Sequence, residues 1–87
     1  MEIKVNNDLT IYCDIEISYF CGNAYHNIEI FKGMNCLLSK HIHGCENGYE
    51  AIFEAINSID NLNVYLYKRK NELYEVVNNH YLESEGC

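Results

Sequence analysis

Basic residues are scarce in this chain of 87 residues. Six Lys and Arg side chains stand against 13 Asp and Glu side chains, which gives a formal net charge of -7. Three of the six basic residues are consecutive, at positions 68–70, so the rest of the chain carries -10, that is, -7 without the +3 of this run. Such a surface repels nucleic-acid phosphate and favours basic protein partners, and the same charge keeps a small protein in solution.

Long apolar runs and paired cysteine motifs are also lacking. No apolar run approaches the roughly 20 residues of a membrane-spanning helix, and the first residues, MEIKVNND, have neither the basic nor the apolar region of an export signal. The five cysteines are odd in number and form no CxxC pair, which is typical of reduced thiols rather than of a disulfide framework. We therefore expect a cytoplasmic protein without a membrane span.

Catalytic signatures are absent as well. The sequence has no glycine-rich phosphate loop, no HExxH motif and no GxSxG motif. A nucleophilic pair of Cys45 with His43 or His26 lacks the signature of any cysteine hydrolase around it. The sequence therefore gives no positive sign of an enzyme, and no cofactor is expected.

Apolar side chains are plentiful and predict an ordered globule. They make up 48% of the chain, which includes eight Tyr and three Phe residues. A chain of this length has room for one core, so residues 1–87 are expected to form a single domain, with residues 1–8 and 83–87 as the parts that fray. Residues 1–5 alternate weakly, which is typical of either a short edge strand or a tail.

Three strands are predicted in the first half of the chain. Residues 9–19 alternate strictly, and the apolar side chains on the face expected to be buried are Leu9, Ile11, Cys13, Ile15, Ile17 and Tyr19. Turn-forming residues at 21–23 and 32–33 separate this strand from two more, at 25–31 and 34–43. Short turns between consecutive strands predict an antiparallel meander.

The second half is organised around residues 47–70, NGYEAIFEAINSIDNLNVYLYKRK. Asn47 is a favourable helix N-cap, and Glu50 follows it three residues later, as in a capping box. The polar run at 60–63 ends this helix, and the β-branched and aromatic residues 64–67 predict a fourth strand.

A second helix is predicted after this strand. Asn71 is its expected cap, and the apolar stripe expected on it consists of Leu73, Tyr74, Val76, Val77 and Tyr81. The expected fold is therefore α+β, in the order β-β-β-α-β-α. It combines the antiparallel three-stranded meander with a fourth strand, joined by a right-handed crossover, and its helices pack on the sheet.

This order of elements resembles the ribonuclease H-like family over residues 9–82. Asp14 in IYCDIE, the turn at 21–23 and Glu50 in NGYEAIFEAI stand where that family has an acid on its first strand, a glycine-containing turn and a catalytic Glu on its first helix. The resemblance implies that Asp14 and Glu50 are residual catalytic, metal-binding acids. The family's third acid belongs at the end of the fourth strand, where this chain has Lys68-Arg69-Lys70, and the family's last strand and closing helices have no counterpart. The resemblance thus implies a truncated relative in which a cation replaces an acid and two-metal hydrolysis is disfavoured.

A metal site is a further hypothesis. His41, His43 and Cys45 alternate along one predicted strand, so their side chains are expected on the same side, and imidazole and thiolate suit zinc. Neighbouring ligands on one straight strand splay apart, however, and a solvated strand face explains the same pattern.

Tyrosines beside charged residues are the candidates for a binding surface. Tyr12, Asp14 and Glu16 share the polar face of the first strand, and Tyr65 and Tyr67 share one face of the predicted fourth strand. Tyrosine anchors a contact at low entropic cost while carboxylates steer a basic partner. The predicted binding residues are Tyr12, Asp14, Glu16, Tyr65, Tyr67, Lys68, Arg69 and Lys70.

The sequence favours a small acidic binding protein that docks on a basic, nucleic-acid-handling protein and inhibits it. Its size, acidity and lack of catalytic motifs resemble phage-encoded inhibitors of host defence, including anti-CRISPR proteins. Two alternatives stay open. One is a residual ribonuclease H-like nuclease or nucleic-acid-binding module, and the other is a structural homodimer that pairs an edge strand, for which residues 25–31 are the candidate.

Overall fold

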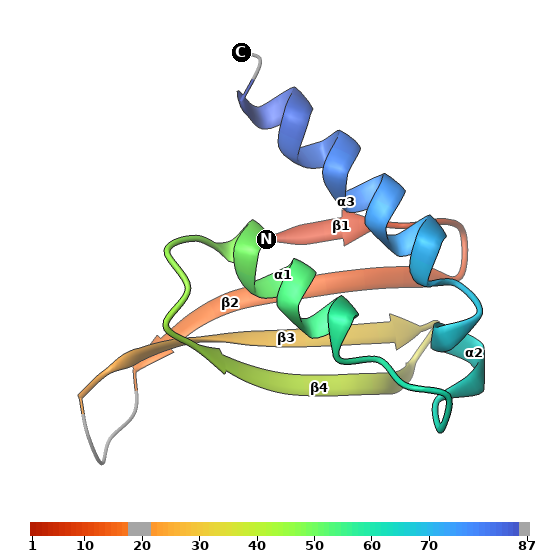
Figure 1. Ribbon diagram of the computed structural model, residues 1–87, viewed down its shortest axis with the longest axis horizontal. Helices are drawn as coiled ribbons and strands as arrows, with labels where there is room; N and C mark the ends of the chain where they lie inside the picture. The colour runs from red at the N-terminus through yellow and green to blue at the C-terminus, as the bar shows by residue number, and fades with distance from the viewer. Residues whose placement is uncertain (18–21, 86–87) are drawn as a thin grey trace.

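The computed structural model describes residues 1–17 and 22–85 (Figure 1). Four antiparallel strands lie in one sheet in chain order: β1 (Glu2–Lys4), β2 (Leu9–Ile17), β3 (Ala24–Lys32) and β4 (Asn35–His43). Three helices follow: α1 (Gly48–Asn57), α2 (Val64–Tyr67) and α3 (Lys70–Glu85). The predicted α+β class and the antiparallel meander are confirmed. Figure 1 shows α1 crossing in front of the sheet, with α3 running beside it over β1.

The core lies between one face of the sheet and the helices. Strand alternation places every second side chain on this face, and the helices supply stripes at helical spacing. The buried apolar residues are Ile3, Leu9, Ile11, Cys13, Ile28, Ile30, Ile42, Ala51, Ile52, Ala55, Ile56, Ile59, Leu66, Leu73 and Val77. Ile3 lies in this core at 2% exposure, so the first residues form an edge strand rather than a tail.

The buried face of β2 is shorter than predicted. Its alternation is confirmed from Leu9 to Cys13, but Ile15 and Ile17 are 69% and 67% exposed. The expectation that both are buried is wrong, because α1 begins at the level of Cys13, whose Sγ lies 3.9 Å from the carbonyl oxygen of Gly48. Tyr19 and Cys21, which the sequence places in the strand and the following turn, lie outside the described residues.

The start of α1 confirms the predicted cap in part. Asn47 Oδ1 accepts a hydrogen bond from the backbone N–H of Glu50 at 2.9 Å. The Glu50 carboxylate reaches the N–H of Glu46 at 3.3 Å, one residue before the position that a capping box uses. The helix begins where the sequence predicts because the free N–H of Glu50, in its first turn, has the Asn47 side chain as acceptor.

The predicted strand at 64–67 is wrong, because these residues form the short helix α2. Asn63 decides the local structure: its Oδ1 accepts from the N–H of Leu66 at 3.3 Å, and its Nδ2 donates to the carbonyl of Leu37 in β4 at 2.9 Å. The fourth strand of the sheet is β1 instead. The sheet is therefore antiparallel throughout, without the predicted crossover, and the order of elements is β-β-β-β-α-α-α.

Helix α3 begins at Lys70, so Asn71 lies inside the helix and is not its cap as predicted. Its expected apolar stripe packs inward at Leu73 and Val77, which are fully buried. Among the described residues, no helix is long and apolar enough to cross a membrane.

Candidate functional site

The face of the sheet that points away from the helices is the most distinctive surface of the described chain. We call it the open face. Alternation along the four strands brings its side chains together, since β2 and β3 pair Tyr12 with Glu29, Asp14 with Asn27 and Glu16 with Tyr25. It includes Glu2, Lys4, Thr10, Tyr12, Asp14, Glu16, Tyr25, Asn27, Glu29, Phe31, Ser39, His41 and His43. Both α1 and α3 lie on the other side of the sheet (Figure 1), so neither helix covers this face.

Aromatic rings contact one another across the strands of the open face. The Tyr12 ring meets the Phe31 ring edge to face, with centroids 5.6 Å apart. The Tyr25 ring lies 4.7 Å from the ring of His41 and 5.3 Å from that of His43. Rings that contact in this way are held in place before any partner arrives, which lowers the entropic cost of binding.

Carboxylates lie among these rings. The Tyr25 hydroxyl donates to Glu16 Oε2 at 2.7 Å, and this hydrogen bond to a carboxylate raises the pKa of Tyr25 above its ordinary value. Asp14 is 69% exposed in its side chain, and its nearest cation is the terminal ammonium of Met1 at 3.9 Å. Glu29 lies opposite Tyr12. The open face thus combines rigid aromatic anchors with negative charge, a composition suited to a basic protein surface.

The remaining predicted binding residues lie elsewhere, around α2. Arg69 stacks on the Tyr65 ring, with its guanidinium carbon 3.6 Å from the centroid, and Lys32 Nζ lies 4.5 Å from the same centroid. Lys70 Nζ donates to the carbonyl of Ile59 at 3.2 Å. The prediction that Tyr65 and Tyr67 share one face is wrong. They lie in a helix, where the side chains of residues two apart point about 200° apart. We call Lys32, Lys68, Arg69 and Lys70 the basic cluster.

The three candidate zinc ligands do not lie on one side. His41 and His43 contact Tyr25 on the open face, whereas Cys45 Sγ donates to Glu54 Oε2 of α1 at 3.1 Å. Gly44 causes the difference, since its φ of 80° turns the chain out of the strand before Cys45. Within residues 1–17 and 22–85 there is no group of three or more His, Cys, Asp or Glu side chains that could hold a metal ion.

Asp14 and Glu50 belong to different layers of the molecule. The start of α1 does adjoin β2, as the contact of Cys13 with Gly48 shows. Asp14 follows Cys13, however, so alternation points its side chain toward the open face. The Glu50 carboxylate stays in the helix layer, bonded to the N–H of Glu46.

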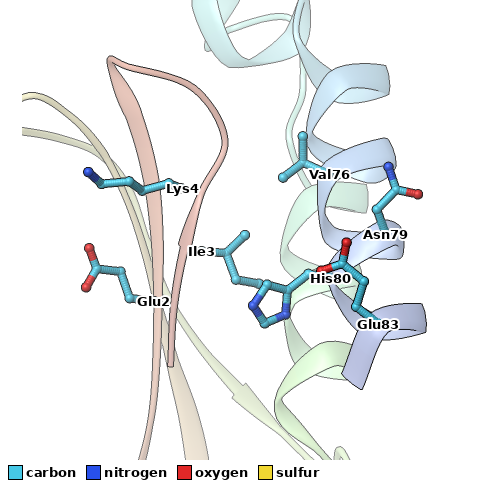
Figure 2. Close-up of a pocket in the computed structure, with 7 residues that line it drawn as sticks. All are labelled: Glu2, Ile3, Lys4, Val76, Asn79, His80 and Glu83. Carbon is cyan, nitrogen blue, oxygen red and sulfur yellow. The ribbon is translucent and has the colours of Figure 1, made fainter. Parts of the chain in front are cut away.

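A groove of about 540 Å³ lies between β1 and the second half of α3 (Figure 2). Figure 2 shows Ile3 and His80 pointing into it from opposite sides, while Glu2 and Lys4 point away on the far side of β1. His80 Nδ1 already bonds the Tyr49 hydroxyl at 2.7 Å. None of the binding, catalytic or metal residues predicted from the sequence lines this groove.

The sequence interpretation missed most of the open face. Tyr25, Glu29 and Phe31 alternate on β3 just as Tyr12 and Asp14 do on β2, so the signal was present. What was missing was the pairing register, which decides that the two polar faces coincide. The short turn at Gly33, with φ of 61°, sets the pairing of Lys32 with Asn35. A β-bulge between Ile30 and Phe31 then shifts the rest of β3 and β4 into the register that brings His41 and His43 to the open face.

No family model matches this chain, and neither a curated protein nor a solved structure matches it.

Proposed function

We propose that this protein is a non-enzymatic binding protein that docks its open face on a basic, nucleic-acid-handling protein and inhibits it. One observation carries the proposal: a sheet face without a helix over it presents contacting aromatic rings among Asp14, Glu16 and Glu29. Hot spots of protein interfaces are rich in such aromatic anchors, and surrounding charges set the association rate and the choice of partner.

The net charge of -7 supports a basic partner. Proteins that handle nucleic acids carry basic surfaces for phosphate, and an acidic face that occupies such a surface blocks it. In size, acidity and lack of catalytic motifs the chain resembles phage-encoded inhibitors of host defence, including anti-CRISPR proteins. A bacterial nuclease or its complex is therefore the first partner to test.

Immobilised protein tests the proposal directly. The wild type should retrieve a nuclease or nuclease complex from a bacterial lysate, and purified protein should then inhibit that nuclease. Tyr12→Ala should weaken retrieval, because the Tyr12 ring meets the Phe31 ring edge to face within the open face. Tyr67→Ala is the matched control, since Tyr67 is 49% exposed on α2, away from the open face. An equal loss of retrieval in both variants would show that the partner does not bind through the open face.

A residual ribonuclease H-like nuclease or nucleic-acid-binding module remains the alternative proposal. Manganese titration followed by a nuclease assay separates it from the binding protein. Activity in the wild type that is lost in Asp14→Asn and in Glu50→Gln would favour the enzyme, and a binding protein should give no such activity.

The structural homodimer cannot use the strand that the sequence suggested. Residues 25–31 lie in β3, which pairs with β2 on one side and with β4 on the other, so this strand is not an edge. The outer edges of the sheet are β1 and β4. Light scattering over a range of concentrations measures whether two copies associate at all.

A further inference from the structure

The second half of β2 has an unpaired edge. β1 pairs only with residues 10–12 of β2, and the backbone of Met1 exchanges two hydrogen bonds with Cys13, at 2.9 and 2.7 Å. Beyond this point, within residues 1–17 and 22–85, no strand lies beside residues 14–17 on this side. Figure 1 shows β2 and β3 running on together past the N-terminus.

The backbone of this edge is oriented for pairing. Hydrogen-bonding direction alternates along a strand, and Cys13 directs both its N–H and its C=O toward Met1. Ile15 and Ile17, two and four residues later, therefore direct their N–H and C=O groups to the same side. Unpaired groups of this kind are a template for another strand.

The side chains of this edge form two rows of opposite character. Ile15 and Ile17 are 69% and 67% exposed on the helix-bearing side, while Asp14 and Glu16 point to the open face. A cavity of about 300 Å³ opens beside Ile15, with Cys13, His26 and Gly48 among its lining residues. Exposed isoleucines next to a cavity are an apolar surface that an added side chain can cover.

We propose that residues 14–17 of β2 receive an extended segment of a basic partner as an added strand, in the row that β1 begins. The inference rests on the proposed function only for the positive charge of the partner. Charge also argues against a second copy as the occupant. Antiparallel pairing of two such edges would bring Asp14 and Glu16 of one copy next to Asp14 and Glu16 of the other, and like charges repel.

The register dictates the sequence pattern of the segment. Residues opposite Ile15 and Ile17 lie on the helix-bearing side, where apolar side chains cover the isoleucines and one enters the cavity. Residues opposite Asp14 and Glu16 lie on the open face, where Lys or Arg pairs with the carboxylates. The segment therefore alternates apolar and basic residues.

A blocked six-residue peptide of alternating lysine and valine is the probe. It is titrated into the full-length protein, with a peptide of the same composition but with its lysines and valines in separate blocks as the control. The alternating peptide should slow hydrogen exchange at the amides of Ile15 and Ile17 by about tenfold or more. The block peptide should not slow it.

Methylation of the peptide backbone tests strand pairing itself. N-methylation of the valines should abolish binding, because these residues lie opposite Ile15 and Ile17 and exchange hydrogen bonds with them. N-methylation of the lysines, whose N–H groups point away from β2, should leave binding within about threefold. Ile15→Lys should weaken binding by about tenfold or more, through lost apolar contact and like charge. Met34→Lys makes the same charge change at a side chain that is 97% exposed on the β3–β4 turn, and should have little effect.

The proposal is overturned if the amides of Ile15 and Ile17 gain no protection, if both methylated peptides bind alike, or if Ile15→Lys and Met34→Lys weaken binding equally. It is also overturned if these amides become protected without peptide as protein concentration rises, because a second copy then fills the edge. Tyr12→Ala separates this inference from the proposed function. Loss of partner retrieval without loss of peptide binding in this variant supports both the open face and the edge site. A wild type that binds the peptide but retrieves no partner supports the edge site and contradicts docking by the open face.

Discussion

Single residues decide which side chains meet in this protein. Gly44, with its φ of 80°, turns the chain after His43, so the histidines of β4 stay on the open face while Cys45 meets Glu54 of α1. Alternation in the sequence alone predicted that His41, His43 and Cys45 lie on one side. A left-handed glycine at a strand end removes the period-two rule for the residues that follow, so Gly44 is the local signal that alternation alone leaves out.

The contact of Cys45 with Glu54 has a measurable consequence. Burial, and then the hydrogen bond to the Glu54 carboxylate, raises the pKa of Cys45 from its ordinary 9.0 to about 11. The thiolate is the reactive form, so at pH 8 Cys45 should alkylate much more slowly than the exposed Cys36, as mass spectrometry can measure. Glu54→Gln should speed its alkylation. Equal rates for Cys45 and Cys36 would contradict the contact.

The same pKa shift sets a pH dependence of stability. The folded state holds the Cys45 proton to a higher pH than the unfolded state, whose thiol has the ordinary pKa of 9.0. Stability from this group is therefore complete below pH 9 and falls as the pH rises from about 9 to about 11. Urea denaturation midpoints across this range should fall less in Cys45→Ser than in the wild type.

The His26 side chain should lower the stability of the core. It is 7% exposed, and its Nε2 has no hydrogen-bond partner among the described residues. A buried polar atom without a partner costs about 1–3 kcal/mol, so His26→Leu should raise the free energy of unfolding by up to this amount. His80→Leu is the matched control and should lower it, because His80 bonds Tyr49. Urea denaturation measures both, and equal losses of stability would contradict this assignment.

At the scale of elements, the sequence predicted best where local signals are complete. Asn47 and the apolar spacing after it specify α1, and the alternation of residues 9–13 specifies the first part of β2. The sequence failed at 64–67, where three of the four residues are β-branched or aromatic and favour a strand, but the structure is a helix. The deciding contact, Asn63 with Leu37, joins residues 26 apart, and local propensity does not report it.

Asn63 should therefore be important for α2. Asn63→Ala removes both the cap to Leu66 and the bond to Leu37, and should lower the free energy of unfolding by about 1–2 kcal/mol. Asn63→Asp keeps the acceptor and loses only the donor, so its loss should be smaller. Thermal denaturation of the three proteins checks this order, and an Ala variant as stable as the wild type would contradict it.

At the scale of the whole molecule, most basic residues lie away from the open face. Three of the four residues of the basic cluster, Lys32, Arg69 and Lys70, contact Tyr65 or Tyr67 of α2, while Asp14, Glu16 and Glu29 lie on the open face. Net charge and composition predicted an acidic binding protein, but not which surface carries the acids beside aromatic rings. The strand register decides this, because it determines which residues of neighbouring strands lie side by side.

The most direct test of the central claim is the association rate with the retrieved partner for two variants of equal charge. The first, Asp14→Asn with Glu16→Gln and Glu29→Gln, neutralises three acids of the open face. The second, Asp8→Asn with Asp60→Asn and Glu75→Gln, neutralises three exposed acids elsewhere and leaves the same net charge. If the open face docks on a basic surface, the first should slow association by about tenfold or more at about 0.1 M salt, and the second should change it little. Equal slowing by both variants, or slowing by the second alone, would contradict the account.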